Sequence, residues 1–256
     1  MNNKKYWEQR ISRVMRDIYN AQEKKNITLL QGYKKALKDV KLEIADLYIR
    51  MGDNPSLSEG YKYNRLKKVE KQIENIIKDL GNIEQKFFDE SLENNYIEAS
   101  NRVIKEFEKH IGINFNKVDR ATIDKVLSYP WSGADYSSRI WNNKDKLINE
   151  LNETLTRGLV QGASLVTLSK EIKSKMDSGA YESLRLIRTE AAHIVNTACI
   201  DRYTKSEMVE TVMWWASEDE RTCSICGALH GQEFTLGKET MNPNHPNCRC
   251  CWIPII

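Results

Sequence analysis

The pattern of cysteine and histidine in the last 34 residues constrains this chain more than any other feature. Five of the six cysteines lie between Cys223 and Cys251. Cys223 and Cys226 are separated by two residues, a span of 18 residues follows, and His245 and Cys248 are again separated by two. This spacing is typical of a tetrahedral metal site, because each pair turns two ligands toward one ion. So short a segment cannot build a sufficient core, and a metal would stabilise it instead.

The choice of four ligands stays open among six candidates. The symmetric set is Cys223, Cys226, His245 and Cys248. If the tail is a strand, Cys248 and Cys250 point to the same face and Cys251 points away, so Cys250 could replace His245 or Cys248. Cys251 precedes Trp252 and is better read as a core residue. The alternative is a metal-free segment with buried or oxidised cysteines. We predict a structural zinc site formed from four of these residues: Cys223, Cys226, His245, Cys248 and Cys250.

The composition indicates a helix-rich chain. Its 256 residues allow one large domain or two smaller ones, with 40% hydrophobic and 29% charged residues but only 5 prolines and 12 glycines. No apolar run approaches the roughly 20 residues of a membrane span, and the charged amino terminus has no apolar region of a signal peptide behind it. We therefore expect a protein made in a cytoplasm without a membrane partner, where clustered cysteines serve as metal ligands rather than disulfides.

The charge is uneven although the net charge is only +3. Residues 1–50 contain 12 lysines and arginines against 6 aspartates and glutamates. Such a basic segment could contact nucleic acid or an acidic protein surface, but the charge pattern by itself favours a solvated helix face. The candidate contact residues are Lys4, Lys5, Arg10, Arg13 and Arg16.

Apolar periodicity predicts long helices in residues 1–112. Residues 4–50 form one or two helices with a stripe of Tyr33, Leu37, Val40, Ile44 and Leu47, and turn-forming residues follow at 53–60. The next helix carries a coiled-coil-like seam and continues to a stop at Gly112. Together they form a helical arm, either a projecting hairpin or two helices of a compact bundle. The seam consists of Val69, Ile73, Ile76, Leu80, Ile83 and Phe87.

Residues 113–210 are predicted to form a helical core. We expect helices at 117–127, 138–158, 165–176 and 181–206, with a turn at Pro130–Gly133 and a loop at 177–179. Cys199 is best interpreted as a buried structural thiol. The last helix has a polar face, which suits a catalytic wall, a buried hydrogen-bond network or a wet surface. This face consists of Arg185, Thr189, His193 and Asn196.

Residues 211–256 contain β-branched and aromatic runs that predict three short strands, at 211–216, 231–235 and 249–254. Pro254 would lie at a strand end or on an edge. The expected fold class is therefore mainly α with a small β-containing carboxy-terminal module of zinc-ribbon or treble-clef-like type (α+β).

Several segments in fixed order resemble the phage minor head, or head morphogenesis, proteins of the Mu F-like family. The resemblance covers roughly residues 125–254, and the opening Tyr6–Arg10 also looks like such proteins from phages of low-GC Gram-positive hosts. The segments are Pro130–Gly133, Tyr136–Trp141, Gly158–Ser164, Arg188–Glu190, Trp215–Cys226, Leu229–Phe234 and His245–Cys250.

The resemblance implies a non-enzymatic virion component present in few copies. Proteins of this kind associate with the portal vertex inside the procapsid and contribute to head assembly, and some take part in delivering the genome. The implied partners are the portal protein, a scaffold or major capsid protein, and packaged DNA bound nonspecifically. The implied location is inside the head near the portal vertex.

Two alternatives start from the same cysteine pattern. A zinc-finger nuclease of the HNH type needs a catalytic histidine beside a divalent ion with an open position, and His230 is the only spare histidine nearby. A zinc-dependent DNA-binding module needs basic residues around the cysteine pairs, and the region offers only Arg221, Lys238 and Arg249. We therefore favour the structural head protein.

Overall fold

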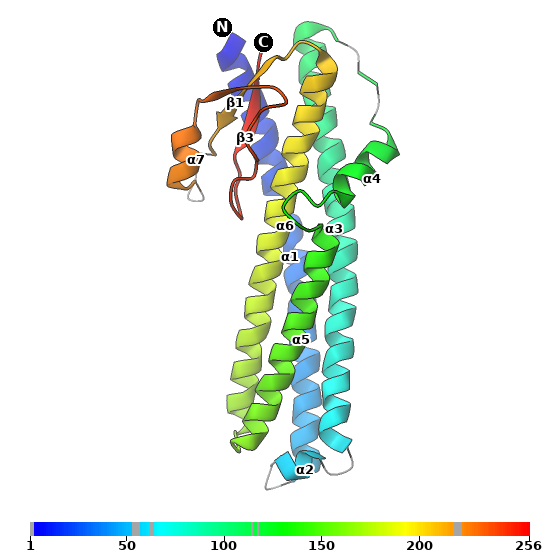
Figure 1. Ribbon diagram of the computed structural model, residues 1–256. Helices are drawn as coiled ribbons and strands as arrows, with labels where there is room; N and C mark the ends of the chain where they lie inside the picture. The colour runs from blue at the N-terminus through cyan, green and yellow to red at the C-terminus, as the bar shows by residue number, and fades with distance from the viewer. Residues whose placement is uncertain (1–2, 53–56, 62–63, 114, 117, 218–221) are drawn as a thin grey trace. The chain divides into compact units, whose positions relative to one another are not determined.

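The computed structural model describes residues 3–52, 57–61, 64–113, 115, 116, 118–217 and 222–256 (Figure 1). Residues 53–56 of the expected turn and residues 218–221 before the first cysteine pair lie outside the described part. Within that part the chain is mainly helical with one small sheet, as predicted. The helices are α1 (Asn3–Met51), α2 (Leu57–Tyr61), α3 (Arg65–Ile111), α4 (Arg120–Ser128), α5 (Tyr136–Val160), α6 (Leu165–Ser206) and α7 (Ser224–Leu229).

The strands are β1 (Thr211–Trp215), β2 (Glu233–Thr235) and β3 (Cys251–Ile255). Their order is β2-β1-β3, and both pairings are antiparallel. The three predicted strands are thereby confirmed. Pro254 lies on the edge strand β3, where its missing N–H leaves no gap in the hydrogen-bond ladder of the central strand. Among the described residues, no helix combines the length and apolarity that a bilayer crossing requires.

The chain divides into two compact units that are described separately. Unit 1 comprises residues 1–25, 88–136 and 185–256, and unit 2 comprises residues 26–87 and 137–184. Helices α1, α3 and α6 contribute residues to both units. Each unit therefore combines segments from more than one of the predicted domains 1–112, 113–210 and 211–256. The division at residues 112 and 210 stays a prediction.

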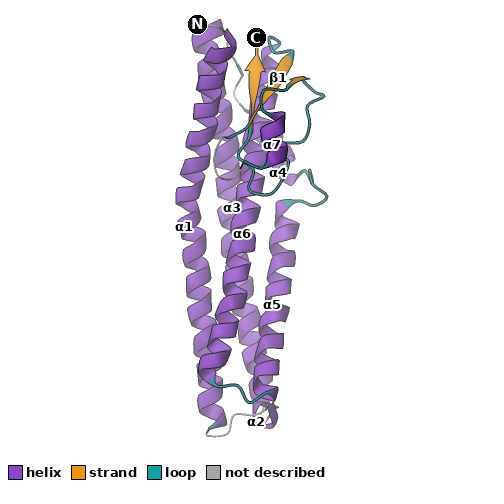
Figure 2. Cartoon of the chain, turned by 90° about the vertical axis from the view of Figure 1, so that its left-hand side faces the viewer, coloured by secondary structure: helices purple, strands orange, loops and turns teal. Residues whose placement is uncertain are grey.

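Unit 2 is a helical bundle in which segments of α1, α3, α5 and α6 lie side by side (Figures 1 and 2). The apolar stripe predicted for α1 and a row of leucines on α5 supply its core. The sequence predicts the first helices either as a projecting hairpin or as two helices of a compact bundle. Within unit 2 their segments pack as part of a bundle. The buried stripe residues are Tyr33, Val40, Ile44 and Leu47 of α1 and Leu147, Leu151 and Leu155 of α5.

The predicted seam of α3 is wrong in its second half. Ile83 is 48% exposed, whereas Ile77 and Glu84 are fully buried. The heptad pattern assumes 3.5 residues per turn, but a straight helix has 3.6, so the buried face drifts by about 20° per heptad. The drift carries Glu84 into the core of unit 2. Its carboxylate forms an ion pair with Lys144 of α5 at 2.6 Å and accepts a hydrogen bond from Tyr33 at 3.0 Å.

The loop predicted at residues 177–179 is also wrong, because α6 is continuous from Leu165 to Ser206. Gly179 sits inside the helix at a close approach to α5. A Cβ atom there would lie 3.0 Å from the side chain of Leu147, so this glycine serves packing rather than a turn. The predicted start of the helix is confirmed, since Ser164 accepts a hydrogen bond from the backbone N–H of Thr167 at 3.2 Å.

In unit 1, short connections follow the capping signals of the sequence. Gly112 ends α3 with a φ of +76°, and Asp119 caps α4 by accepting from the backbone N–H of Thr122 at 2.8 Å. The sheet lies beside the first part of α1 and the last part of α6 (Figure 1), where Lys4 pairs with Glu233 and Tyr203 donates to the carbonyl oxygen of Trp252. The two ends of the described chain meet here, because the side chain of Asn3 donates to the carbonyl oxygen of Ile256.

Candidate metal centre

The polar face of α6 holds the carboxy-terminal segment in place. Asn196 is buried, and its Oδ1 accepts from the backbone N–H of Trp252 at 3.2 Å while its Nδ2 donates to the carbonyl oxygen of Cys250 at 3.1 Å. Two turns earlier on α6, the hydroxyl of Thr189 accepts from the backbone N–H of Asn247 at 3.1 Å. Of the three interpretations of this face, a hydrogen-bond network is therefore the one observed for these two residues. The network fixes the segment that carries His245, Cys248 and Cys250.

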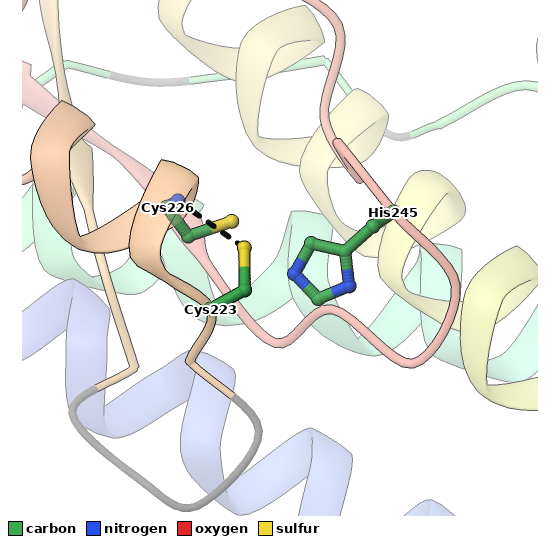
Figure 3. Close-up of side chains that lie close together, drawn as sticks. All are labelled: Cys223, Cys226 and His245. Atoms are coloured by element: carbon green, nitrogen blue, oxygen red, sulfur yellow. Dashed lines mark hydrogen bonds between the residues drawn. The ribbon is translucent and has the colours of Figure 1, made fainter.

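The first cysteine pair is positioned by the short helix α7. Cys223 is its N-cap residue, and its sulfur accepts from the backbone N–H of Cys226 at 3.4 Å. Sγ of each cysteine and a ring nitrogen of His245 all lie within 4.8 Å of one another (Figure 3). The structure thus brings together residues from α7 and from the loop before β3. The sequence analysis missed α7, because six residues carry too weak a periodic signal.

A second group overlaps the first through Cys226. The sulfurs of Cys226, Cys248 and Cys250 lie within 4.8 Å of one another, and Cys226 Sγ is 3.9 Å from Cys248 Sγ. Two sulfurs bound to one tetrahedral zinc ion at about 2.3 Å would lie about 3.8 Å apart. The observed separation fits that requirement and is far longer than a disulfide, and both cysteines are free.

His245 has the hydrogen bonding of a metal-binding histidine. Its Nδ1 is 2.9 Å from the carbonyl oxygen of Pro246, which can only accept, so Nδ1 carries the proton. Nε2 then holds a lone pair. This atom is buried and has no partner among the described residues. A backbone carbonyl that fixes the tautomer is the usual support of a ligating imidazole.

The thiols of the cluster affect one another's protonation. The pKa of Cys248 is lowered to about 6, chiefly because the thiol of Cys250 donates a hydrogen bond to it. Burial and the neighbouring Cys248 raise the pKa of Cys226 to about 12, and the pKa of Cys250 is raised as well. The thiolate of Cys248 therefore forms readily, and its negative charge opposes ionisation of Cys226 and Cys250. A divalent cation removes this opposition, because its charge stabilises several thiolates together.

Comparison with known proteins places the cluster inside a known family segment. Residues 149–253 match the family described as Phage Mu protein F like protein. This segment is therefore similar to the Mu F-like family. The match extends from α5 through His245, Cys248 and Cys250, and it confirms the resemblance found in the sequence. The family indicates a structural protein related to phage heads rather than an enzyme.

The chain is also similar to NAD(+)–arginine ADP-ribosyltransferase EFV of Enterococcus faecalis. The two are 21% identical over 165 residues, which is 58% of this chain and 34% of the relative. The chain thus covers about a third of that relative's length. No solved structure matches the chain.

The motif Arg188–Glu190 of the Mu F-like segment holds three parts of unit 1 against α6. Arg188 forms a two-bond ion pair with Glu23 of α1, both bonds at 2.8 Å. Thr189 accepts from the loop at Asn247, as described above. Glu190 is buried and accepts from Nε1 of Trp131 at 2.8 Å. Each of these three consecutive residues therefore has a positioning role.

The remaining cysteines lie outside the cluster. Cys251 is buried in β3 and belongs to neither group, as the alternation along a strand predicted. Cys199 is fully buried, which confirms its interpretation as a core thiol, and burial raises its pKa to about 12. Burial likewise raises the pKa of Cys251 well above its usual value. Neither thiol therefore ionises readily.

The candidate contact residues lie along the start of α1. Lys4 pairs with Glu233 at 2.8 Å, and Arg10 lies 4.0 Å from Glu106. Lys5, Arg13 and Arg16 are exposed and form no ion pair within the described residues. These three are the basic side chains of the set that are free to contact another molecule.

His230, the candidate catalytic residue of the nuclease alternative, has a structural position. Its Nδ1 accepts from the backbone N–H of Ala216 at 3.2 Å, and its ring packs on Trp215 with centroids 4.7 Å apart. It belongs to neither metal-ligand group in the described part of the chain. The hydrogen bond joins the end of β1 to the residue after α7.

Proposed function

We propose that this chain is a minor structural protein of a tailed-phage head, which associates with the portal vertex and supports procapsid assembly and genome packaging or ejection. The match of residues 149–253 to the Mu F-like family carries this proposal. The proposed partners are the portal protein and a scaffold or major capsid protein. The proposed location is inside the head beside the portal.

Within this role, the cysteine and histidine cluster holds one zinc ion. The available ligands are Cys223, Cys226, His245, Cys248 and Cys250, of which four complete a tetrahedral site. Cys226 belongs to both groups, so we propose it as one of the four ligands. A zinc ion bound there cross-links α7 to the loop before β3. Four protein ligands leave no position for an activated water, so the site is structural.

The basic start of α1 contributes a weak contact to packaged DNA. Lys5, Arg13 and Arg16 lie on one face of α1, since positions 5, 13 and 16 fall within about 80° around a helix with 3.6 residues per turn. Contacts of so few cations with phosphates are nonspecific and weaken as salt concentration rises. We expect the triple Lys5→Gln, Arg13→Gln, Arg16→Gln variant to lose this salt-dependent binding to duplex DNA.

Co-purification with the portal protein tests the proposal directly. The two proteins are expressed together, and the portal is captured through a tag. We expect the full chain to be retained, and to be found by mass spectrometry in purified, nuclease-treated particles. Absence from the particles would contradict the role as a head protein, whereas presence without portal binding would contradict the portal contact alone.

Activity assays separate this role from the enzymatic alternatives. The ADP-ribosyltransferase activity named for the Enterococcus protein belongs to that protein, and the similar region covers only a third of it. We expect no transfer from labelled NAD⁺ to arginine and no cleavage of plasmid DNA with Mg²⁺ or Mn²⁺. Robust plasmid cleavage that is abolished by His230→Ala would replace our proposal with a nuclease.

A further inference from the structure

Unit 1 contains a groove of about 780 Å³ that is separate from the candidate metal ligands. One wall comes from α4 and the turn that follows it, and another comes from the last part of α6. The loop between β2 and His245 forms the third. The lining residues that matter here are Tyr129, Trp131, Ile200, Met241, Asn242 and Trp252. The volume lies within the range of pockets that bind ligands in proteins, about 300–1,000 Å³.

The apolar part of the groove is rigid at its base and exposed at its rim. Trp131 stacks on His193 with ring centroids 4.3 Å apart, and its Nε1 is held by the buried Glu190. By contrast, Tyr129 is 63% exposed and Met241 is 56% exposed. Two large side chains thus face solvent next to a fixed aromatic base, which is the composition of a binding surface rather than of a core.

Some polar groups along the groove have no hydrogen-bond partner among the described residues, and a ligand could supply one. Residues 239–241 form an irregular segment, and their backbone groups make no backbone–backbone hydrogen bond within the described residues. Next to them, Asn242 is only 7% exposed. Its Nδ2 donates to the carbonyl oxygen of Cys250, but its Oδ1 is buried and has no partner in the described part of the chain. A buried acceptor of this kind favours a ligand with an N–H group.

The charges that line the groove favour a basic ligand. Asp201 and Glu239 are acidic, and Lys125 is the single lysine or arginine. Asp201 accepts a hydrogen bond from Tyr96. His193 adds no positive charge at neutral pH, because burial lowers its pKa to about 4. The balance of the lining is therefore one negative charge.

From these observations we propose that the groove binds an extended peptide segment of a partner protein, with an apolar side chain against Trp131 and Met241 and a lysine or arginine facing Asp201 or Glu239. The peptide backbone would hydrogen-bond to residues 239–241 and donate to Asn242 Oδ1. Recognition of a peptide through unpaired backbone, with pockets for alternate side chains, is a recurring mode of protein interaction. The proposal is independent of metal binding and of the identity of the partner.

A displayed library of random seven-residue peptides, selected on the full chain, tests the proposal. Counter-selection uses the double variant Tyr129→Ser, Met241→Ser, which changes two exposed side chains and should leave the fold intact. The matched control is Met208→Ser, because Met208 is 48% exposed and lies outside the groove. Enriched peptides are synthesised, and their dissociation constants are measured by calorimetry, together with versions methylated on alternate backbone nitrogens.

We expect enriched peptides with alternating apolar residues and at least one lysine or arginine. Their affinity should fall at least tenfold for the double variant and for the methylated peptides, and it should be unchanged for Met208→Ser. Enrichment that is equal on the native chain and the double variant would overturn the proposal. So would affinity that is insensitive to backbone methylation. Binding of a twelve-residue oligothymidylate that the double variant loses, without peptide enrichment, would show a nucleic-acid groove instead.

Discussion

The backbone N–H of Trp252 donates to Oδ1 of Asn196 at 3.2 Å, so one side chain of α6 sets the position of strand β3. The side-chain amide of Asn196 also donates, through Nδ2, to the carbonyl oxygen of Cys250. Two residues of the strand segment are thus bracketed by a single asparagine. These two hydrogen bonds therefore help to position Cys248 and Cys250, the cluster cysteines on that segment.

Replacing Asn196 by leucine should destabilise unit 1. The change leaves the buried N–H of Trp252 without an acceptor, which costs about 1–3 kcal/mol of the free energy of unfolding. The carbonyl oxygen of Cys250 keeps Asn242 as a donor. Urea unfolding followed by tryptophan fluorescence measures the loss, with the exposed Asn142→Leu as control. An unchanged unfolding midpoint would show that the hydrogen bonds of Asn196 contribute nothing to stability.

The buried pair of Glu84 and Lys144 gives a prediction for unit 2. Their side chains are 0% and 1% exposed. Lys144→Met alone should cost about 3–5 kcal/mol, because it leaves a buried carboxylate without its cation. The double variant Glu84→Met, Lys144→Met should recover most of that loss. Denaturant unfolding of the single and double variants checks this, and a double variant as unstable as the single one would contradict it.

Two glycines inside helices of unit 2 should respond in opposite directions to alanine. A Cβ atom at Gly81 would lie 2.8 Å from the ring of Trp141, whereas at Gly32 the nearest atom, in Leu80, is 3.4 Å away. Gly32→Ala should therefore stabilise by about 0.5–1 kcal/mol through helix propensity. Gly81→Ala should destabilise despite the same propensity. Thermal unfolding measures both, and equal shifts in one direction would refute the packing argument.

His193 should make unit 1 less stable in acid. Burial lowers its pKa to about 4, from about 6.5 in an unfolded chain. Between these values the unfolded state binds more protons, so stability falls as the pH drops from about 6.5 toward about 4, by up to about 3 kcal/mol. His193→Gln should remove this part of the pH dependence. Urea unfolding at several pH values measures the slope, and identical slopes for both proteins would contradict the assignment.

Local spacing in the sequence was sufficient to predict the long helices, the strands and the metal candidates. The stripe through Val40 and Leu47 indicates one face of a helix. The two-residue gaps between Cys223 and Cys226 and between His245 and Cys248 indicate metal ligands in turns. These signals arise within a few residues of each other. They need no knowledge of what packs against them, which is why they could be predicted.

The features that the sequence could not supply depend on distant partners. From the sequence alone, Glu84 resembles a surface charge, because its ion-pair partner Lys144 is 60 residues away in the chain. Gly179 likewise resembles a loop residue, because the sequence does not show that Leu147 packs where a side chain of residue 179 would lie. The polar face of α6 was equally ambiguous, because nothing near Asn196 in the chain indicates that Trp252 binds it. The choice of four metal ligands stays a prediction for the same reason.

Metal content tests the cluster through individual ligands. We expect Cys226→Ser to abolish zinc binding, because Cys226 belongs to both ligand groups. Cys251→Ser should retain zinc, because Cys251 belongs to neither. Cys248→Ser and Cys250→Ser each test one candidate: a variant that keeps zinc identifies a cysteine outside the set of four, and loss of zinc in both variants shows that both cysteines are ligands. Equal zinc content in all four variants would contradict the assignment.

The zinc-to-protein ratio of the purified full chain, measured by inductively coupled plasma mass spectrometry, tests most directly the claim that a metal ion holds the carboxy-terminal module together. We predict a ratio near one and a lower thermal midpoint after chelation, because the ion links α7 to the loop before β3. A ratio near zero in a protein that is folded, with an unfolding transition that chelators leave unchanged, would contradict the account.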